Sequence, residues 1–158
     1  MPQTKRTPAG EALSELILDL FRLNSLLFTA GDRMVAGLGL TSARWQILGA
    51  IVASERAQPV AWLARDLGAA RQNVQRIVND LQRDGLVTFE TNPHHRRAQL
   101  VVLTEKGRQS FDAAMRLQLP WVNGLSDGLS IKDLEATGRV VSTLRGRLES
   151  SQEPDDRA

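Results

Sequence analysis

The middle of the chain carries apolar residues at a helical period. Four of them stand at i, i+3, i+4 and i+7, namely Val74, Ile77, Val78 and Leu81. This spacing places them on one face of a helix, and we predict that this face packs on a hydrophobic core. The opposite face carries polar side chains: Gln72, Arg76, Asn79 and Arg83, with Gln75 at its edge.

A polar helix face of this composition has two interpretations. Arg pairs with guanine edges and Gln or Asn with adenine edges, so the face suits the major groove of DNA. Many helices, however, expose such a face simply to solvent. For a helix in isolation the solvated surface is the more common case, so the segments around it decide.

A hairpin with a basic tip follows this helix. Gly85 ends the helix, as glycine commonly does at a C-terminus. Residues 86–91 and 99–103 have strand-like composition, and residues 92–97, with the sequence NPHHRR, form the turn between them. Thr104 is placed to cap the next helix. A helix followed by a basic hairpin favours DNA binding over a solvated surface.

Two shorter helices are expected before the polar-faced helix. Thr41 is placed to cap the first, which starts near residue 42 and is followed by a polar connection over residues 54–58. Pro59 suits the first turn of the second, which runs to about residue 67. Together with the polar-faced helix it has the form of a helix-turn-helix. Ala70, just before the polar-faced helix, offers no capping oxygen.

Long helices flank this central part. A helical repeat of leucines runs from residue 11 to about residue 35, and its apolar surface is wider than one stripe. A partner chain or a bulky core within the chain would each explain that width. After residue 104 a helix is expected to end or bend at Pro120, and a last helix spans residues 131–148, with Ser130 and Asp133 resembling a capping box.

These elements predict a mainly α fold with a small β-hairpin wing. We expect one domain over residues 1–158, in which a winged helix-turn-helix over residues 42–104 is flanked by long helices at 11–36 and 105–148, to which the family resemblance given below assigns dimerisation. Residues 1–10 and those beyond 149 are interpreted as polar tails.

Charge and composition narrow the function. The net charge is only +2, but residues 65–108 hold eight Arg or Lys against five Asp or Glu, a local excess of +3 that suits a phosphate backbone. The absence of cysteine excludes disulfides, thiolate metal sites and a thiol-based redox switch within this sequence. No apolar run is long enough to cross a membrane and no signal peptide is visible, so a cytoplasmic protein is expected.

Other functions have weak support in the sequence. His94 and His95 are adjacent in a turn, where two residues seldom reach one ion, and no carboxylate cluster completes a metal site, so we expect neither a metal nor another cofactor. No phosphate-binding loop or nucleophile motif indicates an enzyme. The alternative that stays open is a dimeric protein-interaction module with weak or lost DNA binding.

Three segments together resemble the MarR family of transcriptional regulators. They are GLTSARWQILGAI, LARDLGAARQNVQRIVNDLQRDGLV and NPHHRRAQLVVLTEKG, and the likeness extends from about residue 11 to residue 148. The resemblance implies a homodimer with interlocked terminal helices, whose recognition helices enter the major groove of double-stranded DNA while the wings reach the minor groove. One departure concerns the wing tip, where the family pattern has an Asp two residues before the Arg that corresponds to Arg97, and this chain has His95.

Carried over by position, the resemblance gives two sets of candidate residues. The DNA-binding set is Arg71, Gln72, Asn73, Gln75, Arg76, His95, Arg96 and Arg97. The resemblance also implies a repressor that responds to a small aromatic or anionic effector, bound between the dimerisation helices and the DNA-binding unit. The candidate effector-binding set, chosen for ring and cationic character, is Phe28, Arg33, Arg44 and Trp45.

Overall fold

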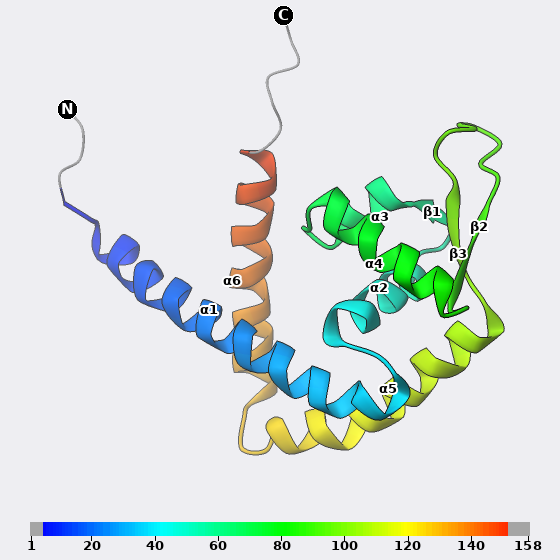
Figure 1. Ribbon diagram of the computed structural model, residues 1–158. Coiled ribbons are helices and arrows are strands. Elements are labelled where there is room, and N and C mark those ends of the chain that lie inside the picture. Colours follow the sequence, from blue (N-terminus) through cyan, green and yellow to red (C-terminus); the bar gives the residue numbers. More distant parts are fainter. Residues whose placement is uncertain (1–4, 152–158) are drawn as a thin grey trace, which may run out of the picture. The chain divides into compact units, whose positions relative to one another are not determined.

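The computed structural model describes residues 5–151 and divides into two compact units. Unit 1 comprises residues 1–119 and unit 2 comprises residues 120–158, so that the boundary falls at Pro120. Figure 1 shows the helices and strands of the chain, coloured along the sequence. The assignment of residues 1–158 to a single domain stays a prediction.

Unit 1 begins with the long helix α1 (Pro8–Val35), followed by the short 3-10 helix η1 (Ala36–Leu38) and by α2 (Ser42–Ala53). The expected tail over residues 1–10 is wrong for its last part, while residues 1–4 lie outside the described residues. The Thr7 side chain accepts a hydrogen bond from the Gly10 N–H, and Pro8 has the fixed φ that suits a first helical position, so the helix starts at Pro8. Thr41 caps α2 as predicted.

The helix-turn-helix consists of α3 (Val60–Asp66) and α4 (Arg71–Arg83). Gly68 lies between them with φ +61°, in the left-handed region that glycine adopts without strain. The predicted apolar stripe of α4 is confirmed, because Val74, Ile77, Val78 and Leu81 are all buried. Ala70 gives α4 no side-chain cap, also as predicted, so packing of this stripe holds the helix in place.

The wing belongs to a three-stranded antiparallel sheet with the order β1-β3-β2. Strands β2 (Val87–Glu90) and β3 (Leu100–Leu103) form the predicted hairpin. Strand β1 (Gln58–Pro59) was not predicted, since the sequence placed Pro59 in the first turn of a helix. It pairs with the edge of β3, where a proline fits because a strand edge leaves some N–H positions unused, and α3 starts one residue later at Val60.

Helix α5 (Glu105–Leu125) starts after the wing, with the Thr104 hydroxyl accepting a hydrogen bond from the Gly107 N–H at 3.0 Å. Pro120 lies inside α5, so the prediction that it could end the helix is wrong. A proline lacks the N–H that would bond to the carbonyl four residues earlier, and the helix continues despite this loss.

Unit 2 contains the end of α5 and helix α6 (Ile131–Ser150). The Ser130 side chain accepts a hydrogen bond from the Asp133 N–H at 3.1 Å, which confirms the predicted cap. None of the residues of α6 is buried in the described chain. Its exposed apolar side chains include Ile131, Leu134 and Leu148.

The core of unit 1 holds the winged helix together. Its fully buried side chains include Leu48 from α2, Leu63 from α3, Leu81 from α4 and Val101 from β3. The predicted fold class, mainly α with a small β wing, is confirmed. In the described part of the chain no single helix is long and apolar enough to cross a membrane. Pro8–Leu38 and Ser42–Ala53 reach that length and apolar content only when they are taken together, and they are bent by 82° relative to one another.

Candidate nucleic-acid interface

The outer face of α4 is polar and open. Arg71, Gln72, Asn73 and Arg76 are exposed, and Gln75 is half-buried. All of them belong to the first half of the helix, because the buried stripe from Val74 to Leu81 turns the other side of α4 to the core. The five α4 residues predicted for DNA contact therefore share one end of one helix.

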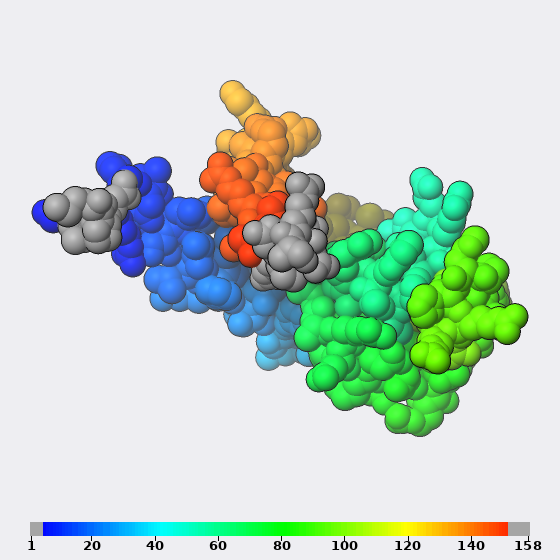
Figure 2. Space-filling model, turned by 90° about the horizontal axis from the view of Figure 1, so that it is seen from above, coloured from blue at the N-terminus to red at the C-terminus, as the bar shows by residue number. Residues whose placement is uncertain are grey.

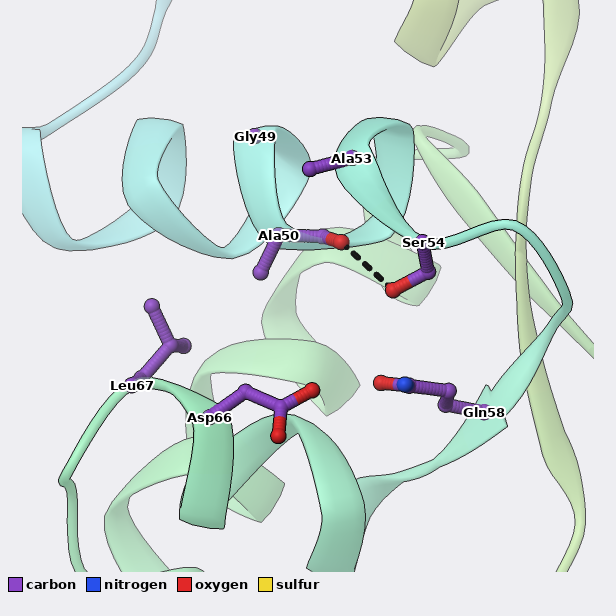
Figure 3. Close-up of a pocket in the computed structure, with 7 residues that line it drawn as sticks. All are labelled: Gly49, Ala50, Ala53, Ser54, Gln58, Asp66 and Leu67. Atoms are coloured by element: carbon purple, nitrogen blue, oxygen red, sulfur yellow. Dashed lines mark hydrogen bonds between the residues drawn. The ribbon is translucent and has the colours of Figure 1, made fainter.

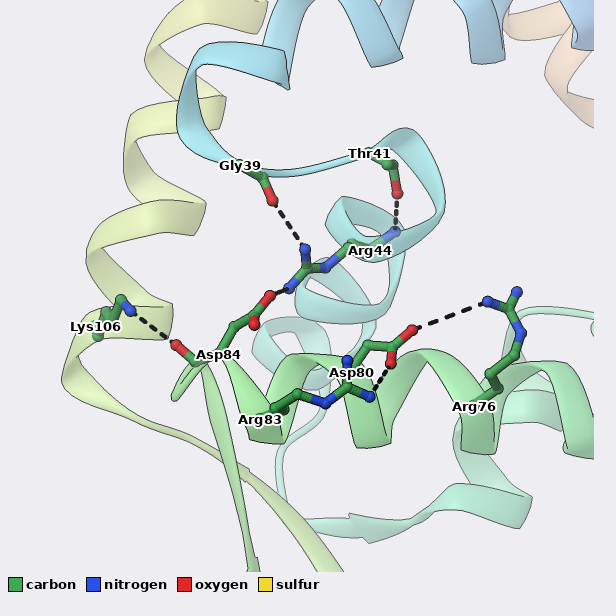
Figure 4. Close-up of polar contacts among 8 residues, drawn as sticks. All are labelled: Gly39, Thr41, Arg44, Arg76, Asp80, Arg83, Asp84 and Lys106. Carbon is green, nitrogen blue, oxygen red and sulfur yellow. Dashed lines mark hydrogen bonds and ion pairs between the residues drawn. The ribbon is translucent and has the colours of Figure 1, made fainter.

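Hydrogen bonds within α4 order several of these side chains. The Gln75 amide donates to the Asn79 Oδ1 at 2.9 Å, and an Arg76 Nη donates to the Asn73 Oδ1, also at 2.9 Å. Asp80 accepts a hydrogen bond from Arg83 at 2.5 Å and lies 3.9 Å from Arg76 (Figure 4). Asp80 thus offsets part of the positive charge of Arg76 and Arg83, whereas Arg71 has no carboxylate partner among residues 5–151.

The tip of the wing carries the other candidates. His95, Arg96 and Arg97 are all exposed, in the loop that joins β2 to β3 and extends beyond α3 and α4 (Figure 1). Figure 2 shows this loop, in yellow-green, standing out beside the green surface of the helix-turn-helix. Neither Arg96 nor Arg97, nor Arg71 on α4, pairs with a carboxylate of residues 5–151. These three guanidinium groups are therefore available to an anionic partner.

Asn92 organises the wing loop, and the sequence did not single it out. Its side chain is buried, with the amide donating to the Ala98 carbonyl and the Oδ1 accepting from the His94 N–H, both at 3.0 Å. Two backbone bonds close the rest of the turn, from the His95 N–H to the Asn92 carbonyl and from the Ala98 N–H to the His95 carbonyl. The side chain of Asn92 and these backbone bonds thus hold the loop. An Asn followed by Pro at the start of a turn was the available signal.

The end of α4 is tied to neighbouring elements by polar contacts (Figure 4). Asp84, the residue after α4, forms an ion pair with Arg44 of α2, and the same guanidinium donates to the Gly39 carbonyl at 2.9 Å. On the other side, the Lys106 ammonium donates to the Asp84 carbonyl at 2.8 Å. The hydrogen bond and charge of Arg44 lower the pKa of Asp84 below its ordinary value of 3.8.

The base of the wing is fixed to the same point. The Thr104 hydroxyl donates to the Gly85 carbonyl at 2.7 Å, and the Thr104 N–H donates to the Leu86 carbonyl at 3.1 Å. Gly107 lies so close that an added Cβ would come within 2.0 Å of the Leu86 carbonyl oxygen. Helix α4 therefore ends at the same junction at which the wing begins and ends, and these contacts fix the position of the helix relative to the wing.

The four candidate effector residues differ in their exposure and in the contacts that they make. Arg44 already uses its guanidinium on Asp84 and Gly39, so an anion at this position would compete with Asp84. Trp45 is half-buried and packs against the core, whereas Phe28 and Arg33 are exposed on α1. The α1 and α2 residues are nevertheless near each other in the fold, because the Ser42 hydroxyl donates to the Phe28 carbonyl at 2.8 Å.

Metal ligands do not gather in the described part of the chain. Among residues 5–151, no group of three or more His, Cys, Asp or Glu side chains could hold an ion. His94 and His95 are neighbours in the exposed wing loop.

Comparison with known sequences places these elements in a family. A model described as the MarR family matches residues 38–98, which contain α2, α3, α4 and the wing loop. An uncharacterised protein of Mycobacterium tuberculosis is 41% identical over 128 residues, which cover 81% of this chain and 88% of that protein. The transcriptional activatory protein BadR of Rhodopseudomonas palustris is 33% identical over 104 residues, which cover 65% of this chain and 59% of that protein.

Solved structures share the fold. The M. tuberculosis regulator MOSR, crystallised in complex with DNA, matches with a TM-score of 0.74 and 24% identity over 86% of this chain and 97% of that chain. The organohalide-sensing regulator RdhR in its 2,4-dichlorophenol bound form matches with a TM-score of 0.79 and 15% identity over 98% of this chain and 93% of that chain. By its sequence match and its winged helix-turn-helix, the chain belongs to the MarR family of DNA-binding transcription regulators.

Proposed function

We propose that the protein is a non-enzymatic repressor that binds a pseudopalindromic operator as a homodimer. Each recognition helix α4 lies in a major groove, about one DNA turn from its copy in the partner. Each wing tip reaches the adjacent minor groove. A small effector relieves the repression by releasing the protein from its operator. The protein acts in the cytoplasm, where its operator is located.

The polar face of α4 together with the exposed arginines at the wing tip is the observation that carries this proposal. Arg71, Gln72, Asn73, Gln75 and Arg76 supply donors and acceptors that suit base edges or phosphates. Arg96 and Arg97 supply positive charge at the projecting tip, where a narrow A·T-rich minor groove attracts arginine. His95 in place of an Asp avoids a negative charge beside phosphate.

Exposed apolar surface supports the homodimer. Phe21 and Leu26 of α1 are 69% and 68% exposed, and Leu148 near the end of α6 is 63% exposed. Exposed apolar side chains that recur along one face of a helix are typical of an interface with another chain. A second copy of the protein supplies the same apolar faces and closes a symmetric dimer.

The effector part of the proposal rests on a smaller basis. RdhR was crystallised with 2,4-dichlorophenol, a small aromatic compound that is acidic. We place the corresponding ligand near Phe28, Arg33, Arg44 and Trp45, and a ligand there acts by its difference in affinity between the DNA-competent dimer and other arrangements. If Arg44→Ala and Trp45→Ala leave release from DNA by a confirmed effector unchanged, the effector binds elsewhere.

A mobility shift with DNA from upstream of the protein's own gene tests DNA binding. The parent is expected to shift a fragment that contains an inverted repeat, with Arg76→Ala and Arg97→Ala each weakening binding by about 10-fold or more, since one good base contact contributes about 1–3 kcal/mol. Arg116→Ala, on the exposed side of α5, removes the same charge and should bind like the parent.

Two results would overturn parts of the proposal. Equal binding by all four proteins would remove α4 and the wing from the interface, and no binding by the parent would favour a dimeric protein-interaction module. A reporter under the shifted promoter tests the direction of regulation. Lower expression without the protein would mean activation, the role that the name of BadR states for that relative.

A further inference from the structure

Residues 94–97 place four side chains with basic nitrogens at the tip of the wing. All four are exposed, and the loop that carries them extends beyond α3 and α4 (Figure 1). The two arginines are always charged, whereas an imidazole gains or loses its charge between about pH 5 and 8. The chain contains only two histidines, His94 and His95, and no cysteine. The side chains that ordinarily titrate in this pH range therefore both belong to the wing loop.

The backbone of the loop fixes the point from which the His95 side chain leaves it. The His95 N–H donates to the Asn92 carbonyl at 3.3 Å, and the His95 carbonyl accepts from the Ala98 N–H at 3.0 Å. Asn92 is itself buried and donates through its side chain to the Ala98 carbonyl at 3.0 Å. The His94 N–H donates to the Asn92 Oδ1, but the His94 carbonyl accepts no hydrogen bond within residues 5–151. His95 is thus tied to the loop on both sides of its Cα, and His94 on one.

The hairpin offers the His95 imidazole little negative charge. Arg96 and Arg97 follow it in the loop, and Glu90 at the end of β2 is the only carboxylate from residue 86 to residue 103. Strand β3 carries no charged side chain. Neither histidine forms an ion pair with a carboxylate among residues 5–151. A protonated imidazole at this position therefore has to find its anionic partner outside the described chain.

DNA supplies that negative charge. A narrow minor groove, which the wing tip is proposed above to reach, attracts His as well as Arg and Lys by its negative potential. Negative charge nearby favours the protonated form of an imidazole. We propose that His95 binds DNA as an imidazolium, so that each wing takes up a proton when the dimer binds its operator. This inference rests on the proposed operator binding. It adds that the affinity for DNA rises as the pH falls, because the bound state holds more protons than the free state.

Fluorescence anisotropy of a labelled DNA fragment from upstream of the protein's own gene measures this linkage at pH 6, 7 and 8 and constant salt. The parent should bind about 10-fold more tightly at pH 6 than at pH 8, because two wings contribute about threefold each. His95→Gln removes the titrating group, so its affinity should change by about twofold or less over the same range. His95→Lys carries a positive charge throughout, so it should bind more tightly than His95→Gln at pH 8 and depend on pH no more than that variant does.

His94→Gln is the matched control, because it removes the neighbouring imidazole and leaves the backbone bonds of His95 in place. It should keep most of the pH dependence of the parent. The salt dependence gives a second readout on the parent. Its logarithmic slope should be steeper at pH 6 than at pH 8 by up to about 2, since each wing then neutralises one more phosphate charge.

Two results would overturn the inference and leave the proposed function in place. The first is the same pH dependence in the parent and in His95→Gln, and the second is a dependence that His94→Gln abolishes instead. In both cases the protein still binds DNA. Absence of binding by the parent at every pH would contradict the proposed function and the inference together. Thermal unfolding at pH 6 and pH 8 confirms that each variant is folded.

Discussion

Helices α4 and α1 both carry apolar residues at a helical period, but they differ in what covers those residues. In α4, Val78 and Leu81 are 0% exposed, and the core of unit 1 covers the whole stripe. In α1, only Gly31 and Val35 are buried, and most leucines of the first two thirds stay open. Periodicity therefore predicts a helix in both cases, but it does not say which molecule covers the apolar face.

The contrast separates two roles. Helix α4 is held from behind by its own chain, which leaves its polar face free to meet DNA in a fixed orientation. Helix α1 has many exposed apolar side chains, and we propose that a second copy of the protein covers them. The variants below act on one side of this contrast or on the contacts that join the two helices.

The largest effect is expected from the same truncation made on both helices. Leu81→Ala should lower the free energy of unfolding by about 2–5 kcal/mol, since it opens a cavity in a closed core. Leu26→Ala, at a side chain 68% exposed, should instead weaken the dimer. Urea unfolding over a range of protein concentrations, with analytical ultracentrifugation, measures both quantities.

The concentration dependence distinguishes the two sites. A loss of stability that is the same at all protein concentrations belongs to the chain itself, whereas a loss through the dimer varies with concentration. An unchanged dimer dissociation constant in Leu26→Ala would remove this part of α1 from the interface.

A smaller effect is expected from Asn92→Ala in the wing loop. The change removes two hydrogen bonds of 3.0 Å from a buried amide, and it should cost about 1–2 kcal/mol, because the partly open loop lets water replace them. Faster hydrogen exchange at the His94 amide, with exchange in α4 unchanged, would show that the loop is affected separately from the helix. Exchange at parent rates in the wing would mean that Asn92 does not hold it.

The smallest effect is expected at the contact that joins the two regions. Arg44 forms this contact, since it bonds to the Gly39 carbonyl, just after α1 and η1, and to Asp84 at the end of α4. The pKa of Asp84 is lowered in the folded protein. Its ion pair with Arg44 therefore stabilises the fold at pH values above 3.8, the ordinary pKa of the group. This stabilisation is lost as the pH falls through the lower pKa that Asp84 has in the folded protein.

Asp84→Asn should accordingly be less stable than the parent at pH 7, with a difference that shrinks below pH 3.8. Urea unfolding at pH 7 and at pH 3 measures it. Asp19→Asn, in an exposed ion pair of α1, serves as the control. A difference for Asp84→Asn that is the same at both pH values would show that the ion pair contributes no stability.

Local patterns explain why most elements could be predicted from the sequence. The stripe of α4, the glycine after it and the caps at Thr41, Thr104 and Ser130 depend on residues only a few positions apart. They identified the helices and the wing before any tertiary contact was known. The start of α1 differs from the prediction, because the composition of residues 1–10 favours a polar tail although Thr7 and Pro8 together form a good helix start.

The features that the sequence did not reveal depend on distant partners. Strand β1 has two residues and exists only because β3 lies beside it. Arg44 and Asp84 are 40 positions apart, so nothing local distinguishes Arg44 as an ion-pair partner from Arg44 as an effector ligand. A hollow between α2 and α3 likewise brings together Ser54, Gln58 and Asp66 from three elements (Figure 3).

The salt dependence of DNA binding tests the central claim, that the polar face of α4 and the wing tip form the DNA interface. The logarithm of the binding constant should fall linearly with the logarithm of the salt concentration, by about 0.9 per phosphate neutralised. In a dimer, Arg97→Ala removes one cation from each wing, so its slope should be less steep by about 2, while Arg116→Ala keeps the parent slope. Equal slopes and equal affinities for all three proteins would contradict the account.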